Sequence, residues 1–168
     1  MKIRTVTANE YTALGQLTVD AYERLFDEPL GAYEHQLRDV AGRAADSVVF
    51  VGVDDADTLL GGVTYVPGAA RAMSEFEDGQ AAGIRMLAVD PRHQGNGVGR
   101  ALMEMCISQA RTDGRARIIL HSTVYMQVAR SLYEHLGFER AADLDVMLTD
   151  EPNSEENPFH LIAYVLEL

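Results

Sequence analysis

The feature that most constrains the fold is a junction at residues 86–106, MLAVDPRHQGNGVGRALMEMC, where an apolar run meets a helical pattern. The apolar run ends at Asp90-Pro91, and three glycines then follow at alternate positions from residue 95. Glycine favours neither a strand nor a helix, but it lets another molecule approach the backbone more closely than a side chain permits. The junction therefore predicts a strand, a glycine-rich loop and a helix that together bind a ligand.

The spacing of apolar residues along the chain predicts one domain over residues 1–168. Polar residues from Asp54 to Thr58 separate two β-rich runs and indicate an antiparallel hairpin, and Thr7 to Glu10 has the spacing of a capping box. Expected helices carry the apolar positions of residues 11–25, 33–44, 98–113 and 128–136. Expected strands cover residues 2–6, 47–55, 59–67, 84–89, 117–124, 143–148 and 159–168. This order predicts a mixed α/β fold, a twisted mixed sheet of about six to seven strands flanked by about four helices.

Composition excludes several classes of protein. A formal charge of −12 argues against nucleic acid or an anionic membrane as the partner. No apolar run is long enough to span a bilayer, and the N-terminus lacks the apolar stretch of a secretory signal. The single cysteine, Cys106, excludes an internal disulfide framework, and the five histidines have no zinc-ligand spacing. We therefore expect a cytoplasmic protein without a metal site.

A strand followed by a glycine-rich turn and a helix is an arrangement that binds phosphates, because free N–H groups at the helix N-terminus point at the ligand. The P-loop pattern is absent, since no Gly-Lys-Ser/Thr follows the loop. The dinucleotide pattern fits Gly95 and Gly97, but its third glycine is replaced by Arg100. The next strand also ends at His121-Ser122, without an acidic residue for a ribose. The pattern that remains is Gln94-x-x-Gly97-x-Gly99.

In this pattern the chain resembles the GNAT (Gcn5-related) N-acetyltransferase superfamily. The segment RMLAVDPRHQGNGVGRALM resembles the acyl-CoA-binding segment of that family, and VARSLYEHLGFER, residues 128–140, is similar to its A-x-x-L-Y-x-x-x-G-F segment. The order of elements also agrees, so the resemblance spans essentially the whole chain. It implies acetyl-CoA as co-substrate and direct transfer, in a ternary complex, to a primary amine carried by a small molecule or a peptide. Homodimers are frequent in such families, although no segment of this sequence identifies an interface.

The loop chemistry fits coenzyme A, because the amides of residues 95–100 can donate hydrogen bonds to its pyrophosphate while Gly97 and Gly99 avoid clashes. Arg92, His93 and Arg100 place positive charge beside this loop. The resemblance further implies that the amide of Leu87 polarises the thioester carbonyl, and a donor of this kind contributes about 3–4 kcal/mol elsewhere. The residues expected to bind the cofactor are Leu87, Ala88, Val89, Arg92, Gln94, Gly95, Asn96, Gly97, Val98, Gly99, Arg100, Met126, Ala129 and Tyr133.

The resemblance also assigns the residues that move protons. Tyr133 occupies the usual position of the general acid, with packing under the sheet as the alternative role. Many members carry a glutamate base four residues before the position of Leu87, but here that residue is Gly83, so an acidic base is ruled out at this position. Members of the family often carry an asparagine three residues before the motif alanine. In this sequence that residue is Met126, which makes this wall of the pocket more apolar. The remaining candidates for the base are Glu75, Glu77, Asp78 and His121.

Two other functions stay open at this point. One is a non-catalytic acyl-CoA-binding or regulatory domain, which the loss of the glutamate at Gly83 favours, and the weaker one is a nucleotide-binding interaction domain. Cys106 lies within the apolar stripe of its helix, so we expect it in the core rather than in an acyl-enzyme. Acidic residues around the expected acceptor side predict a cationic amine as acceptor. These residues are Asp27, Glu28, Glu34, Glu75, Glu77 and Asp78.

Overall fold

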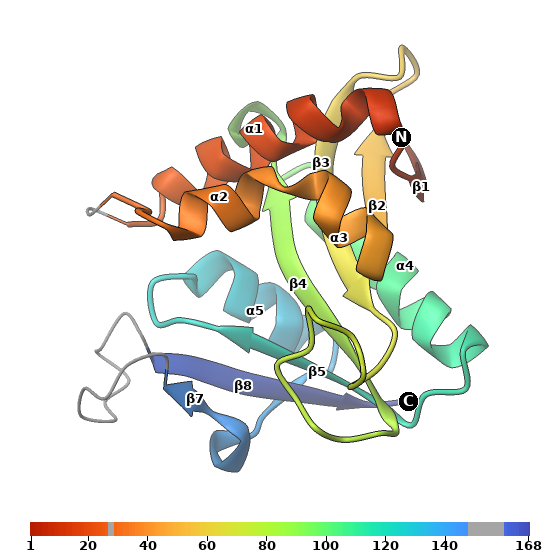
Figure 1. Ribbon diagram of the computed structural model, residues 1–168, viewed down its shortest axis with the longest axis vertical. Coiled ribbons are helices and arrows are strands. Elements are labelled where there is room, and N and C mark those ends of the chain that lie inside the picture. Colours follow the sequence, from red (N-terminus) through yellow and green to blue (C-terminus); the bar gives the residue numbers. More distant parts are fainter. Residues whose placement is uncertain (27–28, 148–159) are drawn as a thin grey trace.

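A computed structural model describes residues 1–26, 29–147 and 160–168. It contains one twisted mixed sheet with helices on both faces (Figure 1). The strand order in the described part is β1-β2-β3-β4-β5-β8-β6, and β7 also pairs with β8. The strands are β1 (Lys2–Thr5), β2 (Val48–Val53), β3 (Leu59–Val66), β4 (Ala81–Val89), β5 (Arg117–Ser122), β6 (Glu139–Arg140), β7 (Val146–Met147) and β8 (His160–Glu167). Among these described pairings only β4 and β5 run parallel, and the others are antiparallel.

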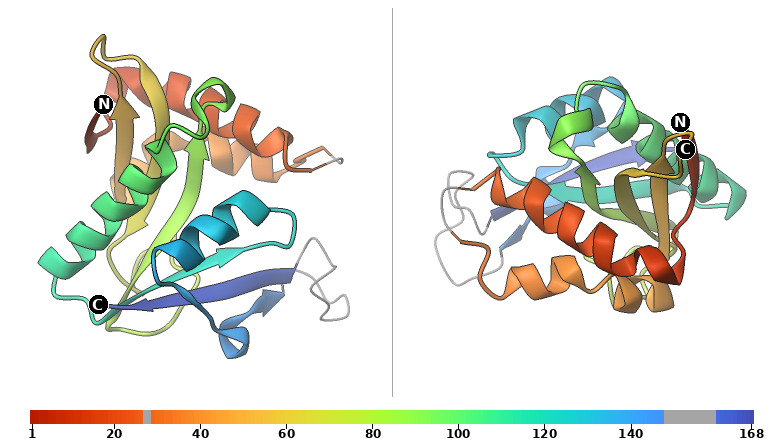
Figure 2. Two further views of the ribbon diagram at one scale, coloured as in Figure 1. Left: turned by 180° about the vertical axis from the view of Figure 1, so that it is seen from behind. Right: turned by 90° about the horizontal axis from the view of Figure 1, so that it is seen from above.

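The helices form two layers (Figure 2). α1 (Tyr11–Glu23), α2 (Tyr33–Arg38) and α3 (Val40–Asp46) cover one face of the sheet. α4 (Val98–Thr112) and α5 (Gln127–His135) cover the other face. The mixed α/β architecture predicted from the sequence is therefore confirmed, with five α-helices in the described residues instead of about four.

The additional helix results from a break in the segment predicted as one helix over residues 33–44. At Asp39 the backbone leaves the helical region (ψ 67°), and the side chain accepts a hydrogen bond from the amide of Gly42 at 2.8 Å. Aspartate at a helix start stabilises a new N-terminus in this way. The chain thus forms two short helices that meet at Asp39, and the prediction of a continuous helix was wrong.

The strand predicted over residues 143–148 is also shorter in the structure. A 3₁₀ turn occupies Ala142–Leu144, and β7 covers only Val146–Met147. Residues 148 and 159, at the edges of two predicted strands, lie outside the described residues. The strand predicted over 84–89 begins three residues earlier, at Ala81.

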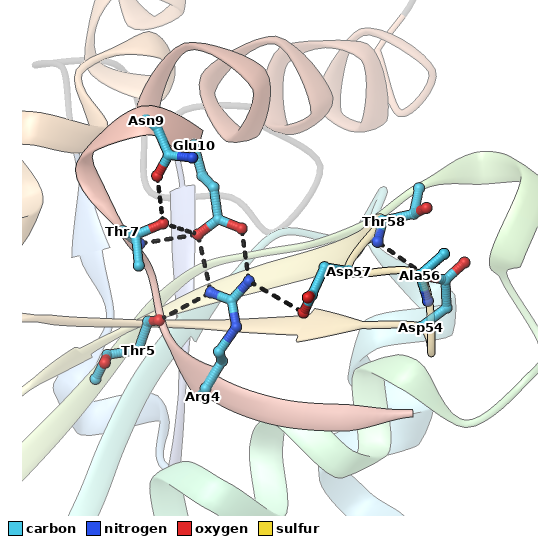
Figure 3. A network of polar contacts seen from close by, with 9 residues as sticks. All are labelled: Arg4, Thr5, Thr7, Asn9, Glu10, Asp54, Ala56, Asp57 and Thr58. Atoms are coloured by element: carbon cyan, nitrogen blue, oxygen red, sulfur yellow. Dashed lines mark hydrogen bonds and ion pairs between the residues drawn. The ribbon is translucent and has the colours of Figure 1, made fainter.

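The capping box predicted at Thr7 to Glu10 is present (Figure 3). The Glu10 carboxylate accepts hydrogen bonds from the Thr7 amide at 2.8 Å and from two nitrogens of Arg4 at 2.7 and 2.9 Å. The hydrogen bond from Arg4 is the main reason why the pKa of Glu10 falls to about 2. Nearby, Asp54 accepts hydrogen bonds from the amides of Ala56 and Thr58, which closes the β2–β3 hairpin (Figure 3). These contacts fix β1 and the start of α1 beside the hairpin.

The helices bury apolar cores against both faces of the sheet. On the α4 and α5 side, Leu102, Cys106 and Ile118 are fully buried. Cys106 lies in the core as predicted, and burial raises the pKa of its thiol. On the other side, Val19 and Leu37 pack with the middle of β4. In the described part of the chain, no helix has the length and apolar character that crossing a membrane requires.

Candidate active site

The site is built around the point where β4 and β5 separate. Their parallel pairing ends with Ile84 opposite Leu120, although β4 continues to Val89. Figure 1 shows the two strands diverging from this point. Met86 has a left-handed backbone (φ 52°), and the register with β3 shifts between Gly62 and Thr64. A bulge of this kind bends a strand, so the last residues of β4 present one main-chain edge that β5 does not cover.

Arg43 of α3 contacts residues on both strands of this bulge. Its side chain is buried, with 3% of the residue exposed, and it contacts the Met86 sulfur at 3.2 Å and the Thr64 hydroxyl at 3.4 Å. It also donates a hydrogen bond to the Leu37 carbonyl at 2.9 Å. Burying a charge is unfavourable unless the charged group has partners. These contacts provide partners for the Arg43 guanidinium and link the bulge to α2.

The loop after β4 leads directly into α4. Asp90 accepts a hydrogen bond from the Arg92 amide at 2.8 Å and so starts the short turn Pro91–His93. Gly95 and Gly97 both have positive φ values, 79° and 80°, and Gly97 is the N-cap of α4. A Cβ at either glycine would meet no atom within 4 Å, so the space above them is open. Glycine is needed for the backbone conformation, and the first-turn amides of α4 have no partners within the helix.

The basic residues predicted beside this loop have acidic partners of their own. Arg92 pairs with Asp90 at 2.7 Å, and Arg100 pairs with Glu104 at 2.9 Å. The hydrogen bond from Arg92 is the main cause that lowers the pKa of Asp90 to about 2. The loop therefore offers backbone amides to an anion, while the two guanidinium groups are paired within their own segments.

The other predicted cofactor residues lie on the two sides of the gap between β4 and β5, which we call its rims: the end of β4 on one side and α5 on the other. Leu87 and Val89 pack toward α4 and α5, whereas Ala88 is buried beneath α1 and α2. A Cβ at Gly99 would lie 3.5 Å from both Val89 and Leu132 of α5, so the first turn of α4 contacts both rims. On the α5 side, Ala129 packs into the same cluster as Leu87, and Met126 packs with the α1 cluster. Gln94, Gly95, Asn96 and Gly97 are exposed and Val98 is buried.

Tyr133 lies on the inner face of α5. Only 6% of the residue is exposed, and its ring packs against Phe138 and Tyr164 with centroid distances of 6.0 and 6.1 Å. It makes no hydrogen bond to any residue that the structure describes. Burial raises the pKa of its phenol well above the ordinary value, so Tyr133 keeps its proton at neutral pH. The side chain thus packs in the core and remains protonated.

A second tyrosine approaches from the opposite face of the sheet. Tyr22 of α1 is 7% exposed and lies beside Tyr33, with the ring centroids 6.1 Å apart. Burial, and after it the hydroxyls of Tyr33 and Tyr133, hold the pKa of Tyr22 well above its ordinary value. Tyr22 therefore keeps its proton at neutral pH.

Two of the four candidate bases come together. The Glu75 carboxylate lies 2.8 Å from the Arg85 guanidinium and 3.3 Å from Nδ1 of His121, and the Leu144 carbonyl lies 2.9 Å from Nε2 of the same ring. Burial disfavours both charged forms. The partners outweigh it, because His121 and Arg85 lower the pKa of Glu75, and Glu75 and the Leu144 carbonyl raise that of His121. Both ring nitrogens of His121 therefore face acceptor oxygens, an arrangement that favours the protonated ring and leaves neither nitrogen open to an incoming proton.

The space over Gly83 is filled from the loop between β3 and β4. A Cβ at position 83 would lie only 2.6 Å from Cε1 of Phe76, so a side chain at this position requires the ring to move. A glutamate at Gly83 is thus incompatible with the position of Phe76. A carboxylate reaches this part of β4 instead from the residue before Phe76 in the loop, Glu75, which pairs with Arg85.

The acidic residues behind the prediction of a cationic acceptor are largely neutralised. Glu34 pairs with Arg38 at 2.7 Å, and Asp78 pairs with Arg117 at 2.7 Å. Glu77 is exposed, and Asp27 and Glu28 lie outside the described residues. The preference for a cationic acceptor stays a prediction, and the structure weakens its electrostatic basis. Within residues 1–26, 29–147 and 160–168, no cluster of three or more His, Cys, Asp or Glu side chains is arranged to hold a metal ion.

A scan of family models matches residues 12–138 to the acetyltransferase (GNAT) family. That match spans well over half of the chain. The chain belongs to the GNAT family.

Among curated GNAT relatives, a mycothiol acetyltransferase of Kocuria rhizophila is 39% identical over 57 residues, which are 34% of this chain and 19% of the relative. An N-acetylaspartate synthetase of Danio rerio is 31% identical over 80 residues, 48% of this chain and 28% of the relative. The chain thus matches only a minor part of the length of these relatives. Their names describe those proteins and not this chain.

Solved structures agree over the whole fold. A ribosomal-protein-alanine N-acetyltransferase from Brucella melitensis has a TM-score of 0.72 at 21% identity, with 100% of both chains covered. A putative acetyltransferase from Salmonella typhimurium, solved with acetyl-CoA, has a TM-score of 0.67 at 19% identity and covers 99% of this chain and 93% of its own. At such identities the likeness establishes the GNAT fold alone.

Three residues of this GNAT site were not singled out from the sequence: Tyr22, Arg43 and Arg85. Arg85 carried a signal, because it is the one charged residue in the apolar run Ala81–Val89. A charge in a buried strand needs a partner, and here that partner is Glu75. Tyr22 and Arg43 carried no comparable signal, since each lies at an ordinary position of a helix.

Proposed function

We propose that the protein is an acetyl-CoA-dependent N-acetyltransferase that acts on a primary amine. The observation that carries this proposal is the separation of β4 and β5 beyond Ile84, with an uncovered edge of β4 that leads into the open glycine loop. This combination fits a long ligand with a phosphate group at one end. The open space over Gly95 and Gly97 and the free first-turn amides of α4 are where a pyrophosphate fits.

Acetyl-CoA supplies the activated acyl group as a thioester. The amides of residues 95–100 would hold the pyrophosphate, and the main chain of Leu87 to Val89 would hold the pantetheine arm. The Leu87 amide would donate a hydrogen bond to the carbonyl oxygen, where negative charge develops as the amine attacks. Tyr133, protonated at neutral pH, would donate its proton to the departing thiolate. The proton that the amine nitrogen loses as the amide forms would pass to solvent water, and water would return a proton to Tyr133.

A second candidate function is an acyl-CoA-binding domain without catalytic activity. The observation that favours it is the replacement of the usual glutamate by Gly83 and the filling of that space by Phe76. In that case the chain would bind acetyl-CoA with normal affinity and release no CoA with any acceptor. The protonated Tyr133 beside the separation favours the enzyme.

The test is a screen for released CoA with a panel of amines and peptides. The panel includes small primary amines and peptides with an N-terminal alanine, because the relatives' names include both small-molecule and protein acceptors. Acceptor-dependent release of CoA, together with a product heavier by one acetyl group, is the expected result. Tight binding of acetyl-CoA without turnover across the panel would support the non-catalytic alternative, and no binding would contradict both.

A further inference from the structure

The strands β4 and β5 separate at a pair of basic residues. The last parallel pair is Ile84 and Leu120, and the next residues along the two strands are Arg85 and His121. Their side chains face the same side of the sheet and reach the same carboxylate, that of Glu75, at 2.8 and 3.3 Å. We call Arg85, His121 and Glu75 the fork cluster. It lies where the opening between the two strands begins.

The fork cluster is largely shielded from water. The exposed fraction of the side chain is 3% for His121, 18% for Arg85 and 21% for Glu75. A buried charge without a partner is strongly unfavourable. Without the carboxylate, Arg85 would lose its counter-charge and His121 would lose the partner of its Nδ1. Glu75 therefore bridges Arg85 of β4 and His121 of β5 and holds the two side chains at a fixed separation.

The position of Glu75 is determined by its loop. Arg85 donates a second hydrogen bond to the Met73 carbonyl at 3.2 Å, and the Met73 amide donates one to Asp46 at the end of α3, also at 3.2 Å. On the other side of Glu75, the ring of Phe76 lies over Gly83. The loop is thus attached to α3 and to β4 on both sides of the carboxylate. Its conformation presents Glu75 to the fork rather than to solvent.

We propose that Glu75 is a positioning residue that sets the separation of β4 and β5 at the acyl end of the cofactor site, and that it is not the general base. The proposal rests on the proposed function. In that arrangement the pyrophosphate end lies at the loop after Val89, and the acyl end lies near Leu87, closer to the fork. Both carboxylate oxygens already face basic side chains, Arg85 and His121. The acetyl group is therefore the part of the cofactor most sensitive to the width of the fork.

The first test compares the affinities of the full chain for acetyl-CoA and for CoA by calorimetry. Glu75→Gln keeps the shape of the side chain but leaves the Arg85 guanidinium at the fork without a carboxylate. We expect the affinity for acetyl-CoA to fall about tenfold, because an uncompensated buried charge is strongly unfavourable, and the affinity for CoA to change less than about threefold. Glu77→Gln, in the same loop but exposed, is the matched binding control, and neither affinity should change.

The second test is a rescue. Glu75→Gln combined with Arg85→Gln removes the cation that has lost its carboxylate, while an amide at position 85 can still donate a hydrogen bond to the Met73 carbonyl. We expect the affinity of this double variant for acetyl-CoA to return to within about threefold of the parent value. A general base would respond differently, because its loss lowers kcat, leaves the affinity unchanged and is not repaired by a second substitution at Arg85.

Each outcome decides. Selective loss of acetyl-CoA affinity with rescue supports positioning, whereas unchanged affinity with lost turnover assigns Glu75 as the base and overturns the proposal. Absence of rescue also overturns it. If Glu75→Gln lowers the folded fraction in circular dichroism, Glu75→Asp replaces it, and equal losses for acetyl-CoA and CoA would then overturn the proposal. A parent chain that binds neither ligand contradicts the proposed function itself.

Discussion

The two halves of β4, residues 81–84 and 85–89, belong to one strand but differ in their pairing. Residues 81–84 pair with β3 or β5, and all four are buried. Among residues 85–89, Arg85, Ala88 and Val89 pair with β3 and none pairs with β5, and buried and half-buried side chains alternate along them. The first half joins two parts of the sheet, and the second half leaves one edge of its main chain for a ligand. One strand thus supplies both stability and the candidate site, and the change occurs after Ile84, where the pairing with β5 ends.

The difference follows from hydrogen bonding. Backbone amides and carbonyls in a protein interior need partners, and in the first half of β4 the partners are neighbouring strands. In the second half the partners on one side must come from water or from a bound molecule. A ligand with a peptide-like arm, such as pantetheine, provides such groups along its length. The comparison therefore predicts that changes in the second half affect binding and turnover, and that changes beside the first half affect stability.

The largest effect is expected in the glycine loop that follows the second half of β4. Gly97→Val should abolish measurable binding of acetyl-CoA, because a β-branched residue disfavours φ 80° and the N-terminal amides of α4 would lose their arrangement. The measurement is calorimetry, with the fold checked by circular dichroism. Gly79→Val is the control, since Gly79 has open space and no positive φ. An unchanged affinity in Gly97→Val would remove the phosphate-binding role of the loop.

The next effect concerns Tyr133 of α5, which lies in the apolar cluster that Leu87 and Val89 of the second half of β4 pack against. Tyr133→Phe keeps the ring and its packing against Phe138 and Tyr164 but removes the proton donor. Turnover should fall by roughly 10²–10⁴-fold, the usual range for general acid–base catalysis, with little change in the affinity for acetyl-CoA. Steady-state rates with the best acceptor of the screen are the measurement. If the rate remains within a few-fold of the parent, Tyr133 has a packing role only.

Beside the first half of β4, the expected effect of a substitution is on the stability of the fold. Ile118 of β5 is fully buried opposite Ala82. Ile118→Ala should lower the free energy of unfolding by about 2–5 kcal/mol, and Ile118→Val by about 0.5–1.5 kcal/mol. Denaturant titration gives these values, and calorimetry at low temperature should show an unchanged affinity for acetyl-CoA. A large loss of affinity in the folded variant would contradict the division of β4 into two roles.

The smallest effect is expected far from β4, at Glu10. Its pKa in the folded chain is about 2, below the ordinary value of about 4.3. The stabilisation is therefore present above the ordinary pKa and is lost as the pH falls through that of the folded state. Relative to the parent, Glu10→Gln should lower Tm by about 2–4 °C at pH 6, and the difference should vanish near pH 2. A difference in Tm that persists at pH 2 would show that the pairing with Arg4 is not its cause.

Several features of the fold and of the candidate site could be predicted because their signals are local. The glycines of the loop, the apolar stripe of α4 and the capping box at Thr7 to Glu10 each depend on residues within a few positions of one another. Local spacing determines backbone conformation and capping directly. The break at Asp39 is also local, but its cap competes with a helical pattern that continues on both sides. The apolar pattern alone therefore predicted one helix where the chain forms two.

By itself, the sequence determined that strand, loop and helix follow one another with glycines at the junction, and that Tyr133 lies on a helix after the next strand. These features depend on short-range geometry, which the order of residues specifies. Only the tertiary structure decided that Glu75 lies between Arg85 and His121, and that Phe76 fills the space over Gly83. These contacts depend on the parallel register of β4 and β5 and on the path of a loop across them. The physical reason is that a charge or a ring finds its partner through the packing of distant segments, which residue spacing does not encode.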